Sequence, residues 1–351
     1  MPSPTPLVVL GEVSTCLAPS ASALDRTHAD ELLALMPGRA VSWRARPSTL
    51  AVSPTTAIGV DCDLALRLSP QDSAAYRARN RRERDRAQIV GTVGTRVVLA
   101  GGRILQSSVH TQIVRSGDRR RQPWSHYVSR KAVTEVLDVL PAERGTASAA
   151  LAKGYLPDPD DDAELGPAPD TGDGEVLDLA SISRRLLGRI RTDPRLDQSP
   201  PVQAGTTRLR WTALVGGAAG PTVQMRLDED NVRTVRLVVR KESDLDAAQR
   251  FCEDLAAHDW LLTVVADALD EADRFGAGQD RLEALAPLVQ HFTGLWMPGA
   301  HTPAALRALW RDLQSDPGFT RQWTTLRDRL RDNISIATLY ALRHKEFDQS
   351  W

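Results

Sequence analysis

Short β-type runs dominate the first 140 residues of the chain. Residues 7–13 form an apolar run with the length of a buried strand, and residues 58–68 begin with apolar side chains at alternate positions, as in a strand with one buried face. Residues 27–36 have helical spacing, with Thr27 as the expected N-cap, and residues 129–140 have the same helical character. This half of the chain therefore predicts a mixed α+β structure.

The clearest local motif is a β-hairpin. Residues 89–100 and 103–115 are two β-rich runs, and only Gly101-Gly102 separates them. A glycine pair in this place favours a primed two-residue turn, because both central residues of such a turn need a positive φ.

Residues 141–175 differ in composition from the rest of the chain. They hold five prolines and a dense run of acidic side chains, with few apolar residues to form a core, so we expect a linker. A helical pattern at 177–190 follows, and then three β-type runs at 206–215, 222–227 and 232–240. Their short connections predict an antiparallel β-meander.

Residues 243–345 predict a helical bundle. Apolar residues recur at helical spacing over 245–269 and 281–296, and Thr302-Pro303 has the residues of a helix start. The last helix carries an apolar stripe at three- and four-residue steps, made of Phe319, Trp323, Leu326, Leu330, Ala337 and Tyr340.

Together these patterns predict an α+β protein with two domains. The N-terminal domain spans residues 1–140 and contains the β-hairpin; an acidic, proline-rich linker spans 141–175. Residues 176–351 combine the antiparallel β-meander with the helical C-terminal bundle. A length of 351 residues agrees with two domains of ordinary size.

The composition places the chain among globular proteins of the cytoplasm. Hydrophobic residues make up 42% of it, and the net charge of −1 creates no overall attraction to nucleic acid or to membranes. No segment approaches the ~18 apolar residues of a membrane span, and the N-terminus lacks the basic region of a signal peptide. The three cysteines are widely spaced and odd in number, so they predict no disulfide framework.

Motifs of the common enzyme classes are missing from the sequence. The glycine-rich segments at 91–94 and 216–220 lack the order of a phosphate-binding loop, and no nucleophile motif occurs. We therefore expect no cofactor and no metal, and the sequence does not favour an enzyme. An alternative is a metal-dependent hydrolase centred on Asp61 and Asp63, which the strand pattern places on one face, with His110 and His126 converging on them.

Two arginine clusters, at 77–86 and 115–121, support another alternative. Arginine beside exposed aromatic residues can bind phosphate and stack on bases, so these clusters are candidates for nucleic-acid binding. The candidate residues are Arg77, Arg79, Arg81, Arg82, Arg119, Arg120, Arg121 and Trp124.

Tryptophan is concentrated in the C-terminal domain. Most of these side chains lie on apolar helix stripes, but Trp296 and Trp310 are candidates for partner contacts because tryptophan is enriched at binding hot spots. Trp351 ends the chain and must either fold back or dock onto another molecule.

Several motifs together resemble an uncharacterised actinobacterial protein family. They are GEVSTCL near the start, GVDCDL at 59–64, GTVGTRVVLAGGRILQSS at 91–108, PWSHY at 123–127, and FCEDLAAHDWLL with LWMPGA towards the end. The resemblance covers nearly the whole chain. Members of that family are hypothetical proteins encoded near a variant P-loop protein, which implies a multi-protein system with a P-loop protein as a partner and supplies no catalytic residues.

The leading hypothesis from the sequence is a non-catalytic subunit or adaptor of a cytoplasmic multi-protein complex. It would bind partner proteins through the C-terminal helical domain. Nucleic-acid binding and metal-dependent hydrolysis remain the alternatives.

Overall fold

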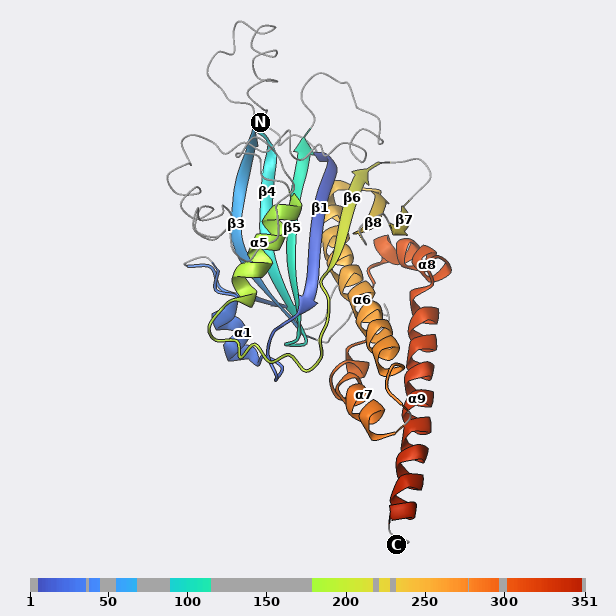
Figure 1. Cartoon of the computed structure of the whole chain (residues 1–351). Coiled ribbons are helices and arrows are strands. Elements are labelled where there is room, and N and C mark those ends of the chain that lie inside the picture. The colour runs from blue at the N-terminus through green and yellow to red at the C-terminus, as the bar shows by residue number, and fades with distance from the viewer. Residues whose placement is uncertain are drawn as a thin grey trace, which may run out of the picture.

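Eight strands form one sheet, in the order β2-β3-β4-β5-β1-β6-β8-β7, in the computed structural model of the chain (Figure 1). The structure describes residues 6–35, 38–44, 55–67, 89–114, 179–216, 221–227, 232–276, 278–296 and 302–348. The strands are β1 (Pro6–Leu17), β2 (Ser42–Arg44), β3 (Thr56–Arg67), β4 (Ile89–Ala100), β5 (Ile104–Val114), β6 (Thr207–Val215), β7 (Thr222–Leu227) and β8 (Val232–Val239). The α-helices are α1 (Arg26–Leu32), α5 (Leu179–Arg191), α6 (Leu245–Ala272), α7 (Gln279–His291), α8 (Arg307–Ser315) and α9 (Phe319–Asp348).

Strand β1 lies inside the sheet and is antiparallel to β5 on one edge and to β6 on the other. Its residues alternate between two cores, as the two-residue period of a strand requires. Val9 and Val13 belong to a core with α6, whereas Leu10 and Cys16 belong to a core with α1 and α5. We name the two sides of the sheet the α6 face and the α5 face.

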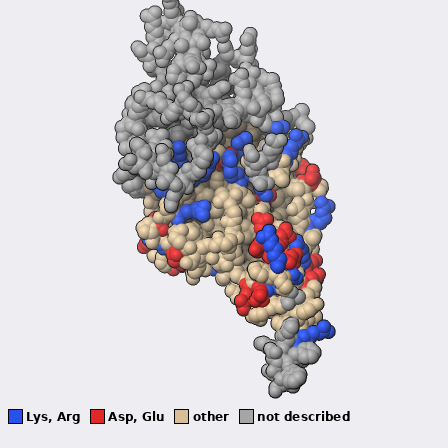
Figure 2. Space-filling model, in the orientation of Figure 1, with Lys and Arg blue, Asp and Glu red and all other residues tan. Residues whose placement is uncertain are grey.

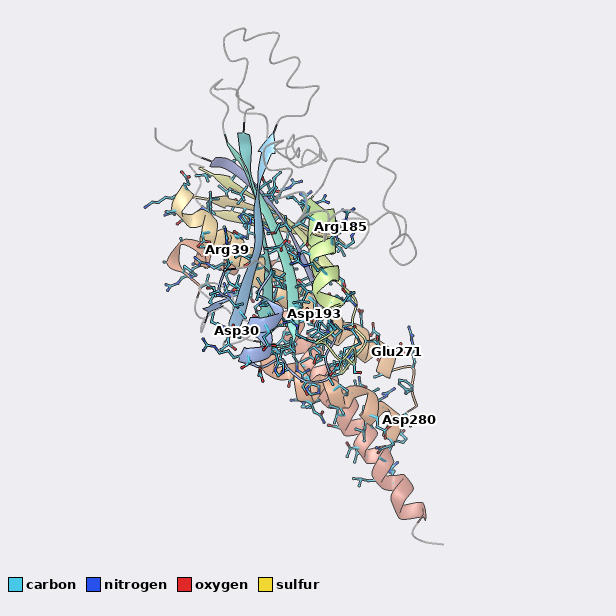
Figure 3. All side chains as sticks on the ribbon, turned by 90° about the vertical axis from the view of Figure 1, so that its left-hand side faces the viewer. Asp30, Arg39, Arg185, Asp193, Glu271 and Asp280 are labelled. Atoms are coloured by element: carbon cyan, nitrogen blue, oxygen red, sulfur yellow. The ribbon has the colours of Figure 1, made fainter. Side chains whose placement is uncertain are left out.

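The C-terminal helices cover the α6 face. In the 28-residue α6, which lies between the sheet and the helices α7 and α9, 18 residues are buried. On the other face lies α5, which carries Arg185, while Glu271 belongs to α6 and Asp280 to α7 (Figure 3). The mixed α+β composition and the C-terminal helices predicted from the sequence are therefore present.

The predicted hairpin is confirmed. Strands β4 and β5 pair antiparallel up to Ala100 opposite Ile104. Gly101 and Gly102 have φ angles of 59° and 68°, and the Arg103 amide donates a hydrogen bond of 3.1 Å to the Ala100 carbonyl. The turn needs glycine because side chains rarely tolerate two successive positive φ angles.

The antiparallel β-meander predicted for residues 206–240 is wrong. Strand β8 lies between β6 and β7 and is parallel to β6, so only β7 and β8 form a hairpin. The physical reason is burial: β8 is mostly buried, whereas β7 has four exposed residues among its six and takes the edge of the sheet. An apolar strand gains most from the inner position, where both of its edges are paired and both of its faces are covered.

The predicted N-cap of the first helix is wrong. The N-cap of α1 is Asp25, whose side chain accepts a hydrogen bond from the His28 amide, and not Thr27. The predicted helix at 129–140 and the predicted linker at 141–175 lie outside the described residues. The strands described before and after that segment share one sheet, and the predicted domain boundaries remain predictions.

Two glycines in the inner strands make room for large neighbouring rings. A side chain on Gly11 of β1 would overlap the buried Trp211 indole of β6, and one on Gly94 of β4 would overlap the His110 ring of β5. The indole and the imidazole thus occupy space above the backbone of the adjacent strand.

The variant Gly11→Ala is expected to be less stable than the wild type by about 1–3 kcal/mol or more, because Trp211 has no free space into which it can move. Chemical denaturation measures this difference. The matched control is Gly188→Ala in α5, where nothing lies within 4 Å of the new methyl group. The control should be as stable as the wild type or more stable by up to about 1 kcal/mol; equal denaturation midpoints for the two variants would contradict the packing described here.

Candidate functional site

Of the two aspartates expected to share one face, the structure describes the side chain of Asp61, and the side chain of Asp63 lies outside the described residues. Asp61 is buried on the α5 face, where its Oδ1 accepts a hydrogen bond of 3.0 Å from Arg189 Nη2 of α5. A bulge then shifts the register of β3, and Asp63 lies opposite Gly94. The shared face of the two aspartates therefore stays a prediction.

His110 lies on the α6 face, away from Asp61. Its ring packs over Gly94, and its Nδ1 is 3.0 Å from Nε2 of Gln249 in α6. His126 lies outside the described residues. Within the described part of the chain, no three His, Cys, Asp or Glu side chains lie together as metal ligands. The sheet separates Asp61 from His110, and the hydrolase hypothesis remains a prediction that depends on residues not described.

Acidic residues of α6 make buried ion pairs with arginines of the sheet. Glu253 is fully buried, and its Oε1 accepts a hydrogen bond of 2.6 Å from Arg96 Nε of β4. Asp254 accepts a hydrogen bond of 2.7 Å from Arg44 Nη2 of β2. A buried charge must be paired to be tolerated, so these contacts fix how α6 lies across β2 and β4. The sequence signal for them is two adjacent acids within an otherwise apolar helical run.

A third, partly buried ion pair joins α6 to β8. Asp259 Oδ2 is 2.7 Å from Arg233 Nε. Burial raises the pKa of Asp259 to about 6, although the Arg233 guanidinium acts in the opposite direction. Burial also raises the pKa of the Cys16 thiol to about 12 and that of the Cys252 thiol well above its usual value. These two cysteines are therefore protonated and shielded, as expected of structural rather than reactive thiols.

The candidate partner-binding tryptophans take part in the packing of the helices. Trp296 stacks on Trp323 of α9 with ring centroids 4.8 Å apart, and the His258 ring of α6 meets Trp296 edge-on at 4.7 Å. Trp310 of α8 packs against Phe319 at 6.2 Å. Trp296 and Trp310 are half-buried, so they hold the helices together and expose only part of their rings. Trp351 lies outside the described residues.

Large apolar side chains are exposed near the C-terminal end of α9. Ile336, Leu339 and Tyr340 are 45%, 63% and 46% exposed, and the last two lie three and four residues after Ile336, on the same side of the helix. We call these three residues the α9 stripe. Leu342 is exposed on a neighbouring side of the helix. The C-terminal turns of α9 project beyond α7 (Figure 1), so the described residues leave the stripe uncovered.

Contacts with α6 and α7 hold the preceding part of α9 in place. Arg329 binds Asp270 at 2.7 Å and Asp273 at 2.5 Å, and Arg281 of α7 donates a hydrogen bond of 3.1 Å to Asn333. Ala337 is fully buried on the same side of the helix. The α9 stripe therefore lies on a supported helix rather than on a free tail.

Arginines also gather on the α5 face of the sheet. One row of residues crosses four neighbouring strands from position to paired position. It begins at Glu12 of β1 and continues through Arg210 of β6, Thr234 of β8 and Arg226 of β7. The buried Glu12 carboxylate accepts hydrogen bonds from Arg208 at 2.9 Å and from Arg210 at 3.5 Å. We name as the basic face the four residues Arg208, Arg210, Arg226 and Arg236. Blue side chains are visible over this part of the sheet in Figure 2.

The arginine clusters predicted from the sequence belong to other segments of the chain than this surface. The following candidates lie outside the described residues: Arg77, Arg79, Arg81, Arg82, Arg119, Arg120, Arg121 and Trp124. The basic face is a separate group of arginines that sequence reasoning missed. Its signal was the alternation of arginine with other residues at the start of β6, which places Arg208 and Arg210 on one face.

A hollow of about 450 Å³ lies beside the β4–β5 turn. Its charged lining residues are already engaged, because Asp25 caps α1 and the Arg26 guanidinium lies 5.2 Å from the centre of the Trp43 ring. The remaining lining is mostly apolar, with no group placed for acid–base chemistry.

Comparison with known proteins finds no matching family model, no matching curated protein and no matching solved structure. The resemblance to an actinobacterial family, with its P-loop partner, stays a prediction from the sequence. None of the helices in the described ranges has the length and apolar character that a bilayer span requires.

The raised pKa of Asp259 predicts a pH dependence of stability. Between pH 4 and pH 6 the folded protein holds the Asp259 proton more tightly than the unfolded chain, so the contribution of this group to the free energy of unfolding falls as the pH rises. The variant Asp259→Asn cannot lose a proton. The stability of the wild type relative to this variant should therefore fall by up to about 3 kcal/mol from pH 4 to pH 7.

Urea denaturation at several pH values checks this expectation. The matched control is Asp267→Asn, which changes an exposed carboxyl on the same helix. A difference between wild type and Asp259→Asn that is the same at pH 4 and pH 7 would contradict the raised pKa.

Proposed function

We propose that this chain is a non-catalytic protein that binds a partner protein through its C-terminal helical region. The observation that carries this proposal is the α9 stripe, a row of exposed apolar side chains on a helix that projects beyond the bundle. A single exposed apolar residue is ordinary on a protein surface, but contiguous exposed apolar residues are typical of binding sites.

The spacing of the residues in the α9 stripe suits binding to a helix or an apolar groove of a partner protein. Amphipathic helices bind partners through anchors spaced three and four residues apart, which is the spacing of Ile336, Leu339 and Tyr340. The ion pairs of Arg329 and the buried Ala337 hold this part of α9 before any partner arrives. A preformed helix loses little conformational entropy on binding, which favours affinity.

The ionisable side chains inside the fold support a non-catalytic role. Glu253, Asp254, Asp259 and Asp61 are each engaged by an arginine from another element, and each pair joins a helix to the sheet. Such pairs stabilise the arrangement of the elements and leave the carboxylates less available for proton transfer.

The double variant Ile336→Glu/Leu339→Glu tests the proposal. Two charges in the middle of the stripe should reduce capture of the partner from an extract of the source cells by at least about tenfold, since burying an unpaired charge costs more than 1.4 kcal/mol. Quantitative mass spectrometry of the captured proteins measures the loss. The matched control is Thr338→Glu, which adds a charge to an exposed position on another side of the same helix.

The control variant should capture the same partner as the wild type. Equal capture by wild type and by the double variant, with both folded by circular dichroism, would show that the stripe does not bind the partner.

The basic face favours a second candidate function, the binding of a polyanion such as nucleic acid. Arg210 and Arg226 flank Thr234 in one row, and Arg236 lies two residues further along β8. Glu12 neutralises part of this charge through Arg208 and Arg210, while Arg226 is exposed. A sheet surface that carries several arginines can contact successive phosphates.

The double variant Arg210→Glu/Arg226→Glu tests this second function. If the basic face binds DNA or RNA, fluorescence anisotropy should show binding that weakens steeply with salt, and the variant should bind at least about tenfold more weakly. Arg274→Glu is the matched control, because it reverses an exposed charge just beyond the C-terminal end of α6. A wild type that binds neither DNA nor RNA at low salt would exclude this function.

A further inference from the structure

We infer that the partner of the α9 stripe is a second copy of this chain, with the two α9 helices side by side and antiparallel. This inference rests on the proposed function and names its partner. It follows from the spacing and from the charges of the residues on the exposed side of α9.

The spacing is that of a short coiled-coil seam. Asp332, Ile336, Leu339 and Arg343 follow one another at steps of four, three and four residues, so they share one side of the helix. All four are on the solvent side: the Asp332 side chain is 69% exposed, and Arg343 is exposed as well. The seam therefore has two apolar residues in its middle and one charge of each sign at its ends.

The charges select the direction of pairing. In an antiparallel pair centred between Ala337 and Thr338, Ile336 of each copy faces Leu339 of the other. The same register brings Asp332 of each copy opposite Arg343 of the other, so both ends of the seam gain an ion pair. A parallel pair would instead place Asp332 against Asp332 and Arg343 against Arg343, where like charges repel.

The rest of the fold leaves space for this pairing. Asn333 and Ala337 are buried and turn toward the body of the protein, so the seam lies on the other side of the helix. The C-terminal turns of α9 project past α7 (Figure 1), which lets a second helix lie along them. Because the seam is only three helical turns long, we expect a dimer whose population depends on the protein concentration.

Charge reversal with the full-length protein tests the antiparallel pairing. Sedimentation velocity over a range from low micromolar to several hundred micromolar should show a concentration-dependent dimer for the wild type. Asp332→Arg and Arg343→Asp each place like charges at both ends of the seam, and each should raise the dimer dissociation constant by at least about tenfold. An equimolar mixture of these two variants should dimerise again, because each then supplies the opposite charge to the other.

The double variant Asp332→Arg/Arg343→Asp should dimerise as the wild type does, because exchanging the two charges restores an ion pair at each end of the seam.

The matched control is Arg327→Asp, an exposed charge reversal on another side of α9, which should leave the dimer unchanged. Dimerisation of Asp332→Arg or Arg343→Asp with the wild-type dissociation constant would overturn the antiparallel register, as would a mixture that stays monomeric. The wild type could be monomeric at every concentration, while the variant Ile336→Glu/Leu339→Glu fails to capture a different protein that the wild type captures from cell extracts. That result would overturn self-pairing and leave the proposed function standing. If the wild type is monomeric and the double variant captures the same proteins as the wild type, both the self-pairing and the proposed function are overturned.

Discussion

Strand β1 is the element on which the rest of the structure depends, because it pairs with β5 along one edge and with β6 along the other. Both of its faces are covered: Val13 packs under α6, and Leu10 packs on the side of α5. Gly11 in its middle leaves room for the Trp211 indole, which is fully buried. The pairing of β1 joins strands that lie far apart in the chain, so the stability of each half depends on the other.

Helix α6 contacts this sheet through two chemically different groups of side chains. Its apolar residues, such as Phe251 and Leu255, share a core with β1, β6 and β8. Its acids Glu253 and Asp254 instead meet arginines of β4 and β2. Removing one partner of such a buried pair leaves an uncompensated charge and costs about 3–5 kcal/mol. The apolar contacts therefore supply the attraction, while the ion pairs set the one orientation of α6 in which every charge has a partner.

This orientation of α6 determines where α9 projects. Asp270 and Asp273 near the end of α6 bind Arg329, and α7 binds Asn333. These contacts hold α9 up to the position at which it passes the end of the bundle. The α9 stripe follows directly, so the surface that we propose for partner binding is carried by the same framework of ion pairs that positions the sheet and α6. A binding role needs α9 to be held rigidly in this way. It does not require any of the buried carboxylates to act as a catalyst.

Local chemistry made much of the fold predictable from the sequence. The Gly101-Gly102 pair determined the β4–β5 turn because only glycine accepts two successive positive φ angles readily. Apolar periodicity likewise located α6, α7 and α9, since one side of each helix is buried whatever its neighbours are. The apolar character of β1 also followed from its sequence.

Only the tertiary structure decided the order of the strands and the surroundings of the polar residues. The insertion of β8 between β6 and β7 depends on competition between strands for the buried position, and the sheet separates Asp61, which contacts α5, from His110, which contacts α6. Arg44 and Asp254 are 210 residues apart in the chain, so no local pattern could pair them. Tyr340 continues the apolar stripe predicted for the last helix, yet it is exposed, because α9 is longer than the bundle that covers it. Periodicity in a sequence shows which side of a helix is apolar, but only the positions of the other elements determine whether that side is covered.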